Sequence, residues 1–354
     1  MNRFLFVAAL LTAGGCLERH PDSGERTSPS SIERVSVMTY NVENLFDAED
    51  DPGKDDRAFL PIGLKQDKEH VEACGLLRRE RWREECLTLD WNEKVLGRKI
   101  RRIGEVILAS EEGRGPDVLI LEEVENKRVL ERLRVFLSSA GYAPGVLIEG
   151  GDARGIDAAI LSRLPQARVP VLHEIPGAPL TRRGVLEAAF RLPDNNVLTV
   201  FALHLPSPGS PRSEREAGLR RLNALLGSKG PTEMVVAGGD FNITSSEDAA
   251  FGLLDAHLSP NWIIAHRAGC AGCAGTAYYR ATENWSFLDM ILASKNLDSA
   301  GSAPWRLLEN SVRVVSGAPG QKNRWGAPAR FDPVFGTGAS DHFPLQATLV
   351  KRKN

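Results

Sequence analysis

The order of hydrophobic and polar residues from position 32 onward predicts a mixture of strands and helices. Residues 35–40 alternate in a β-rich run that ends at Asn41, which is typical of a strand. Residues 92–110 repeat apolar side chains at the spacing of one helix face. Further strands are predicted at 117–121, 156–161, 197–203, 234–238, 287–293 and 345–350, and further helices at 127–140 and 213–226. Strands and helices do not alternate strictly and no proline-rich linker divides them, so residues 32–352 are predicted to form one domain.

Two charged segments interrupt this pattern. Residues 47–56 are acidic and rich in turn formers, so they are predicted to form a loop. Glu43 and Asp47 either touch a second cation or belong to a solvated acidic loop, and we favour the loop. Basic residues gather between positions 78 and 102, where they either face a phosphate backbone or form the charged face of a helix.

Residues 1–16 have the order of an export signal. Arg3 precedes the apolar run 4–11, and small residues then lead to Cys16. This ending resembles a bacterial lipobox, in which Cys16 is lipidated and becomes the new N-terminus, and the alternative is a plain signal peptide cleaved nearby. We therefore expect an exported lipoprotein, anchored to a membrane through Cys16 and facing the periplasm or the cell surface. The polar residues 17–31 are predicted to form a flexible tether.

Composition excludes several classes of protein. The chain has 354 residues, of which 42% are hydrophobic and 25% charged, and its formal net charge is −2. These values exclude a disordered chain, a collagen-like chain and a coiled coil. The near-zero charge also excludes a protein that binds nucleic acid by bulk electrostatics alone, although a bound metal could supply local positive charge.

The cysteines fit an oxidising compartment. Besides Cys16 the chain has Cys74, Cys86, Cys270 and Cys273, which is an even number. Their spacings suggest two local bridges, Cys74–Cys86 and Cys270–Cys273, although four cysteines allow three pairings. A zinc site and a redox-active Cys-x-x-Cys pair remain as alternatives.

Polar residues gather where the predicted strands stop. They lie at or near the ends of apolar runs: Asn41, Glu123, His204, Asp240, Asn242, Asp289, Asp341 and His342. Turn chemistry can explain each one alone, because Asp and Asn commonly follow strands. Taken together, oxygen ligands and two histidines suit a hard cation and phosphoryl chemistry.

The motifs around these residues resemble those of the endonuclease/exonuclease/phosphatase superfamily. Seven motifs appear in the family's order: Thr39 to Phe46, Pro116 to Val124, Arg154 to Leu161, His204 to Ser207, Gly238 to Asn242, Ser286 to Ile291 and Ser340 to His342. Each is weak alone, but seven in order is a specific signature. The resemblance implies a four-layer α/β sandwich, in which two packed mixed β-sheets are flanked by helices and the active site lies where strand ends converge.

The resemblance also implies ligands for a metal and a phosphate. The position of Glu123 binds the catalytic Mg²⁺ in the family, and Asn41 lies beside it as a neutral oxygen ligand or phosphate contact. Asp341 is expected to be a further metal-side carboxylate. Arg154 is expected to bind phosphate oxygens. The expected cofactor is therefore Mg²⁺, with Mn²⁺ as a substitute.

Five catalytic roles follow from the same resemblance. Asp240 and Asn242 lie two apart on what is predicted to be an extended segment, so we expect them to point the same way, orient the attacking water and contact the phosphate. His342 is expected to contact the phosphate or act as general base, with Asp289 holding its imidazole. His204 is a candidate general acid for the leaving oxygen.

The function expected from this set is metal-dependent hydrolysis of phosphodiester bonds by in-line attack of water. We favour an extracytoplasmic nuclease, with nucleic acid as substrate and no obligate protein partner. The alternative is a phosphatase or phosphodiesterase acting on a lipid or small-molecule phosphate. A non-enzymatic binding protein on the same fold is disfavoured, because such a protein should have lost at least one of these residues.

Overall fold

The computed structural model describes residues 33–177 and 182–353. The predicted signal segment, the lipidated Cys16 and the tether 17–31 therefore lie outside the described residues. Glu33–Asn354 form one compact unit by their internal contacts. Within the described ranges, no helix has the length and apolar character needed to span a membrane.

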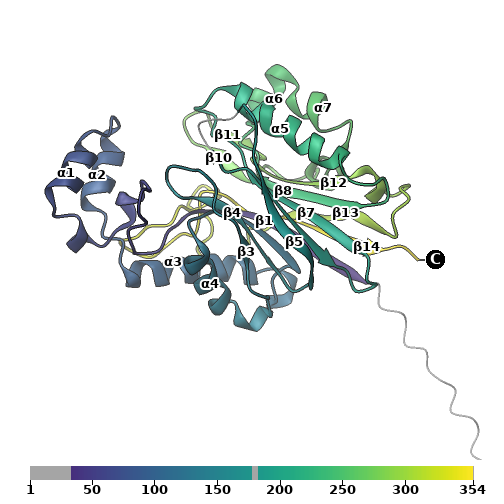
Figure 1. Ribbon diagram of the computed structural model, residues 1–354, viewed down its shortest axis with the longest axis horizontal. Coiled ribbons are helices and arrows are strands. Elements are labelled where there is room, and N and C mark those ends of the chain that lie inside the picture. The colour runs from purple at the N-terminus through teal and green to yellow at the C-terminus, as the bar shows by residue number, and fades with distance from the viewer. Residues whose placement is uncertain (1–32, 178–181, 354) are drawn as a thin grey trace, which may run out of the picture. The chain divides into compact units, whose positions relative to one another are not determined.

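Two six-stranded sheets make up the centre of this unit (Figure 1). In spatial order, the first contains β13 (Trp305–Val314), β14 (Leu345–Lys351), β1 (Arg34–Leu45), β2 (Val118–Val124), β4 (Asp157–Ser162) and β3 (Val146–Leu147). The second contains β5 (Gln166–His173), β6 (Val185–Arg191), β7 (Val197–His204), β8 (Met234–Asp240), β12 (Asp289–Ser294) and β9 (Trp262–Ile264). Both are mixed, because β1–β2 and β7–β8 are parallel while their other pairs are antiparallel.

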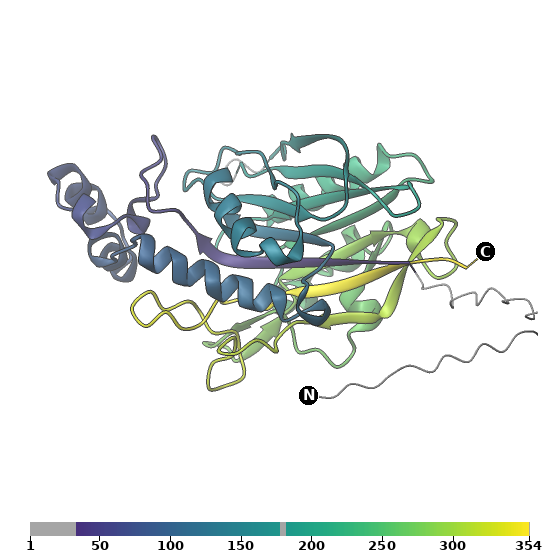
Figure 2. The ribbon, with the colours of Figure 1, turned by 90° about the horizontal axis from the view of Figure 1, so that it is seen from below.

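Helices lie outside the two sheets. Their bounds are α1 Lys68–Gly75, α2 Glu80–Thr88, α3 Glu93–Leu108, α4 Lys127–Phe136, α5 Arg212–Gly227, α6 Ser245–Phe251, α7 Leu253–His257 and α8 Ala265–Gly269. Of these, α1 and α2 pack on each other away from the strands and cover neither sheet (Figure 1). Short 3-10 turns are η1 Arg57–Phe59, η2 Ile62–Leu64, η3 Glu111–Gly113, η4 Ser138–Ala140 and η5 Lys295–Leu297. Figure 2 shows α3 lying along β1.

Three buried apolar clusters separate the four layers. One lies between the sheets and includes Ile120 and Val200. A second joins the first sheet to α3 and α4, and a third joins the second sheet to α5 and α7. Each sheet is thus apolar on both faces, as a sheet covered on both sides must be. The predicted four-layer sandwich of two mixed sheets flanked by helices is confirmed.

Several predicted boundaries shift. β1 runs on past Asn41 to Leu45, with a register shift against β2 at this point, and β2 runs on to Val124. The helix predicted to reach residue 140 ends at Phe136. Seven of the described strands were not predicted: β3, β5, β6, β9, β13 and, outside the two large sheets, β10 (Ala277–Tyr279) and β11 (Asn284–Ser286). β5 lies at a sheet edge and is largely exposed, so its pattern of burial carries little periodic signal.

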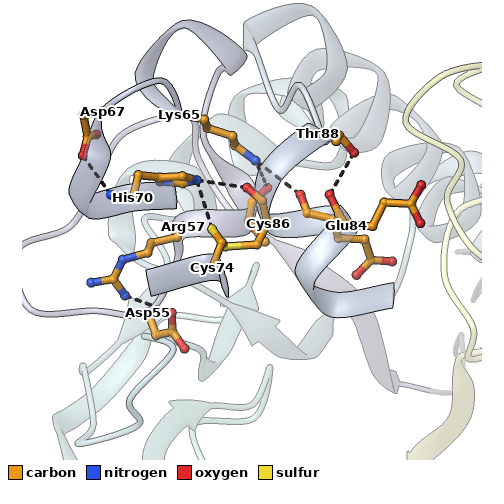
Figure 3. The surroundings of a disulfide bond; sticks show 11 residues. Asp55, Arg57, Lys65, Asp67, His70, Cys74, Glu84, Cys86 and Thr88 are labelled. Atoms are coloured by element: carbon orange, nitrogen blue, oxygen red, sulfur yellow. Dashed lines mark hydrogen bonds and ion pairs between the residues drawn. A yellow bond between two sulfur atoms is a disulfide. The ribbon is translucent and has the colours of Figure 1, made fainter. Parts of the chain in front are cut away.

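Both predicted disulfides are present. Cys74–Cys86 joins α1 to α2, and Cys270–Cys273 closes the short loop after α8. Figure 3 shows His70 beside the first bridge, where its Nε2 lies 3.2 Å from Cys74 Sγ. Because the sulfurs are bonded to one another, the structure supports disulfide bridges over the zinc site left open by the sequence.

Several basic side chains between residues 78 and 102 bind backbone carbonyl groups of this protein. Lys99 is buried and donates to the carbonyl of Ala339 at 2.8 Å. Arg98 and Arg102 donate to carbonyl groups of residues 333–336. These side chains therefore hold the loop before Asp341 against α3.

Candidate active site

Strand register places three predicted site residues side by side in the second sheet, where β7 and β8 end and β12 begins. His204 is the partner of Asp240 in the β7–β8 ladder, and Asp240 is the partner of Asp289 in the β8–β12 ladder. All three side chains are buried. The sequence placed each of them near a strand end, and the pairing of the strands brings them together.

Asp240 connects this row to the first sheet. Asn41 on β1 donates from Nδ2 to Asp240 Oδ2 at 3.0 Å. The same oxygen lies 3.6 Å from Nε2 of His204 and 4.0 Å from Nε2 of His342. Burial raises the pKa of the Asp240 carboxyl to about 7, so this group can change its protonation state near neutral pH.

His342 and Asp289 form a buried pair. Nδ1 of His342 lies 2.7 Å from Asp289 Oδ2, so the carboxylate holds the imidazole by a hydrogen bond. Burial opposes the charged imidazolium, but Asp289 and then Asp240 and Asp341 outweigh it, and the pKa of His342 lies well above its ordinary value. The Nε2 face of His342 therefore presents a proton donor at neutral pH.

Glu123 has an unusual backbone and an ionised side chain. Its φ is +64°. Its carboxylate accepts from the backbone N–H of Asn44 at 2.8 Å and lies 3.4 Å from Nδ2 of Asn41. Burial would raise its pKa, but its basic neighbours, first His204 and then Arg154 and Arg183, lower it to about 2. Glu123 is thus a partly buried anion that faces other polar groups of the site.

The donor set fits a hard divalent cation. Glu123 supplies an ionised carboxylate, and Asp341 supplies a partly exposed one. Oδ1 of Asn41 accepts the Glu43 amide at 2.9 Å, which leaves one lone pair for a metal. Such an all-oxygen set is typical of Mg²⁺ or Mn²⁺ sites.

Two arginines lie beside Glu123. Arg154, predicted from the sequence, donates to Oδ1 of Asn44. Arg183, which sequence reasoning missed, donates from Nε to Asp152 at 2.9 Å. Arg183 lies just before β6, in a segment where no motif indicated a site residue. Their charges make this side of the site suitable for phosphate oxygens.

His204 differs from His342 in its surroundings. Its Nδ1 is buried and has no hydrogen-bond partner in the part of the chain that the structure describes. Burial and then the charge of Arg183 lower the pKa of His204 well below its ordinary value, so it is neutral at pH 7. A neutral imidazole can donate a hydrogen bond but is a poor general acid, which differs from the role expected from sequence.

The extended conformation expected for Asn242 is wrong. Its φ is +53°, and Nδ2 of its side chain donates to the carbonyl of Leu205 at 2.9 Å. The Asn242 backbone also donates to Oδ1 of Asp240 at 2.9 Å. β8 ends at Asp240 in a side-chain-to-backbone turn, and Asn adopts the left-handed region more readily than most residues. Asn242 therefore holds the turn that positions Asp240.

The solvated loop favoured for Glu43 and Asp47 is also wrong, because both side chains are buried. Glu43 accepts from Nε of Arg330 at 2.5 Å and from the Phe331 amide at 3.2 Å. Burial raises the pKa of Glu43 to about 7. Glu122 was missed as well, although it is fully buried and accepts from Thr39 at 2.9 Å. Through these contacts, the side chains of Glu43 and Glu122 support the strands of the candidate site.

Comparison with known proteins agrees with this geometry. A model described as the Endonuclease/Exonuclease/phosphatase family matches residues 38–342. No curated protein matches the chain by sequence.

Solved structures with a similar fold share little sequence with the chain. An endonuclease/exonuclease/phosphatase from Beutenbergia cavernae is 17% identical, with 90% of this chain and 72% of that chain covered and a TM-score of 0.54. A family protein from Bacteroides thetaiotaomicron is 15% identical, with 91% and 100% covered and a TM-score of 0.56. D. rerio TDP2, solved with a single-strand DNA product, is 16% identical, with 89% and 98% covered and a TM-score of 0.52.

Proposed function

Because the chain belongs to the endonuclease/exonuclease/phosphatase family, whose members hydrolyse phosphodiester or phosphate bonds, we propose that it is an extracytoplasmic nuclease that requires Mg²⁺. The observation that carries this proposal is the convergence of His204, Asp240 and the His342–Asp289 pair around one point beside Glu123. The DNA product bound to the similarly folded D. rerio TDP2 supports a nucleic-acid substrate. The two disulfides support an oxidising location.

The proposed mechanism assigns one task to each side chain. Glu123, Asp341 and Oδ1 of Asn41 would hold Mg²⁺, which when bound polarises a phosphoryl oxygen and offsets developing charge. Arg154 and Arg183 bind phosphate oxygens, which orients the scissile group.

The remaining residues handle water and protons. Asp240, with its pKa near neutrality, orients the attacking water and accepts its proton. Protonated His342 donates from Nε2 to a phosphate oxygen, while Asp289 keeps its ring in place. Neutral His204 donates a hydrogen bond to the leaving oxygen.

Nuclease assays on the purified full-length chain test the proposal. Plasmid DNA should be cleaved with Mg²⁺ or Mn²⁺ and remain intact with a chelator. Glu123→Gln keeps the shape of the side chain but removes its charge, and should reduce cleavage by roughly 10²-fold or more. Exposed Asp255→Asn is the control and should cleave like wild type. Inactivity on DNA and RNA, together with turnover of a phospholipid or sugar phosphate, would refute the nuclease assignment.

A lipid or small-molecule phosphate is the second candidate, and one observation favours it. The hairpin of β10 (Ala277–Tyr279) and β11 (Asn284–Ser286) pairs with His342 through Ala277, and Tyr279 on it is 67% exposed. Trp325, which is 55% exposed, lies under the guanidinium of Arg280 at 4.7 Å. Exposed aromatic rings beside cationic groups suit a membrane interface.

A substrate panel separates the two candidates. Duplex DNA, single strands, RNA, sphingomyelin vesicles and inositol phosphates should be compared with the wild type and with Tyr279→Ala/Trp325→Ala. A lipid substrate predicts that the variant loses turnover on vesicles and keeps turnover on a soluble analogue. A nuclease predicts cleavage of nucleic acid alone.

A further inference from the structure

A second carboxylate cluster lies next to the catalytic residues without belonging to them. Its members are Asp47, Asp51, Asp56 and Glu125, which come from the loop after β1 and from the residue after β2. Asp47, Asp56 and Glu125 are at most 3% exposed. No step of the proposed reaction uses them.

Positive charge near this cluster is scarce. In the described residues, Arg128 alone forms ion pairs with the cluster, at 2.9 Å from Asp47 and 2.6 Å from Asp51. Its side chain is half exposed. One guanidinium therefore faces four carboxyl groups, and it reaches two of them. Unpaired buried carboxylates are costly unless another positive group or a proton neutralises them.

The hydrogen-bond donors are too few as well. Nδ2 of Asn126 lies 2.9 Å from Asp47, 3.1 Å from Asp51 and 3.1 Å from Glu125. An amide nitrogen carries two hydrogens, so it cannot serve three acceptors fully. The side-chain amide of Asn126 is fixed in this orientation, because its Oδ1 caps α4 by accepting a hydrogen bond from the backbone N–H of Val129 at 3.0 Å.

Two oxygens of the cluster have no hydrogen-bond partner among the described residues. They are Oε1 of Glu125 and Oδ1 of Asp56, and both are buried. The other oxygen of Glu125 accepts the Asp47 amide at 2.7 Å, which orients the carboxylate into the cluster. Burial raises the pKa of Asp56 to about 6. Two buried carboxylate oxygens of the cluster thus lack a hydrogen-bond donor within the described residues.

From this geometry we propose that Asp47, Asp51, Asp56 and Glu125 bind a calcium ion at a site separate from the catalytic metal. Carboxylates from a loop are ligands of the kind that Ca²⁺ takes in six- to eightfold coordination. Within the described residues, their oxygens do not form a group as compact as that of His70, Cys74 and Cys86, so calcium binding requires these carboxylates to move closer together. Ca²⁺ tolerates long, variable bonds, whereas Mg²⁺ demands a small octahedron.

The bound ion ties the acidic loop to the start of α4. The same loop reaches the segment before Arg154, because the Asp55 amide donates to the Ala153 carbonyl at 2.8 Å and Lys54 donates to the Asp152 carbonyl at 3.2 Å. Calcium would therefore stabilise the loop that supports a phosphate-binding arginine.

Calcium binding to the full-length chain carrying Glu123→Gln tests the site, because this variant lacks one of the two carboxylate ligands of the catalytic metal. After chelation and desalting, calorimetric titration with CaCl₂ should show one ion per chain, and calcium should raise the melting temperature. Adding Asp56→Asn and Glu125→Gln should weaken binding on the order of tenfold or more, since affinity follows ligand charge. Glu49→Gln, an exposed neighbour in the same loop, is the matched control and should bind like its parent.

The readouts do not depend on activity, so they fail independently of the nuclease assignment. No calcium binding and an unchanged melting temperature in the Glu123→Gln chain would overturn the proposal. Equal binding by the doubly changed chain would also overturn it, because the ion would then lie elsewhere. If that chain does not fold, the calcium content of the Glu123→Gln chain after gel filtration decides alone: about one ion supports the site, and none refutes it.

Discussion

Two buried histidines of the candidate site carry different charges because their neighbours differ. His342 has a carboxylate 2.7 Å from its Nδ1, and its pKa is raised. His204 has a buried Nδ1 that no group in residues 33–177 or 182–353 hydrogen-bonds, and its pKa is lowered. The residue type was readable from the sequence, whereas the charge depends on groups that are distant along the chain.

Asp289→Asn tests the partnership with His342 at the scale of one residue. The amide keeps the size of the side chain but removes the negative charge that favours the imidazolium. Activity should fall roughly 10²- to 10⁴-fold, as when an orienting carboxylate is lost in other histidine-dependent enzymes. Turnover measured beside circular dichroism checks this, and activity within twofold of wild type with an unchanged spectrum would contradict the role.

His266 should make stability depend on pH. It stacks on Phe287 at 4.2 Å, and burial, then Arg267, lower the pKa of His266 to about 4. The unfolded chain, with an ordinary pKa of about 6.5, takes up the proton at higher pH than the folded chain. The contribution of His266 to the free energy of unfolding is therefore fully present above about pH 6.5. It is lost as the pH falls toward 4, which lowers the free energy of unfolding by roughly 3 kcal/mol.

Urea unfolding between pH 7 and pH 4 measures this loss. His266→Phe keeps an aromatic ring against Phe287 and removes the titrating group, so its free energy of unfolding should fall less over this range. Parallel curves for variant and wild type would show that His266 does not contribute.

At the scale of elements, β8 depends on a glycine. Gly239 has a φ of +155°, and a Cβ there would lie 1.9 Å from the carbonyl oxygen of Leu203 on β7. That oxygen belongs to the ladder that places His204 beside Asp240. A side chain at this position must push the two strands apart.

Gly239→Ala should therefore cost several kcal/mol of stability, roughly 2 to 4 by analogy with other overpacked or strained positions, and should reduce activity. Gly97→Ala is the matched control: it lies inside α3 with nothing within 4 Å of its Cβ position, and should stabilise by about 1 kcal/mol. Thermal unfolding and turnover of both variants check the pair. An unaltered melting temperature for Gly239→Ala would contradict the steric argument.

At the scale of the whole molecule, the fold does not determine the cellular location of the protein. Glu33–Asn354 form a compact unit, and the predicted lipidation site lies before it. Expressed in a bacterium with its own N-terminus, the wild type should incorporate labelled palmitate and sediment with membranes. Cys16→Ser should lose the label and move to the soluble fraction. Unlabelled wild type in the soluble fraction would favour a plain signal peptide.

The sequence by itself determined the family, the sandwich and seven of the fourteen described strands, because each motif is a short run whose chemistry is local. It also indicated both disulfides, since Cys74–Cys86 and Cys270–Cys273 are close along the chain. Periodicity located α3 and α5 to within two residues, because each buries one face.

The tertiary structure decided what depends on distant neighbours. Asn242 leaves the extended conformation because a turn links it to Leu205 and Asp240. Asp47 is buried because residues after β2 fold over its loop, which no local pattern records. Burial and charge are set by every group packed around a side chain, and most of those groups lie tens of residues or more away in the chain.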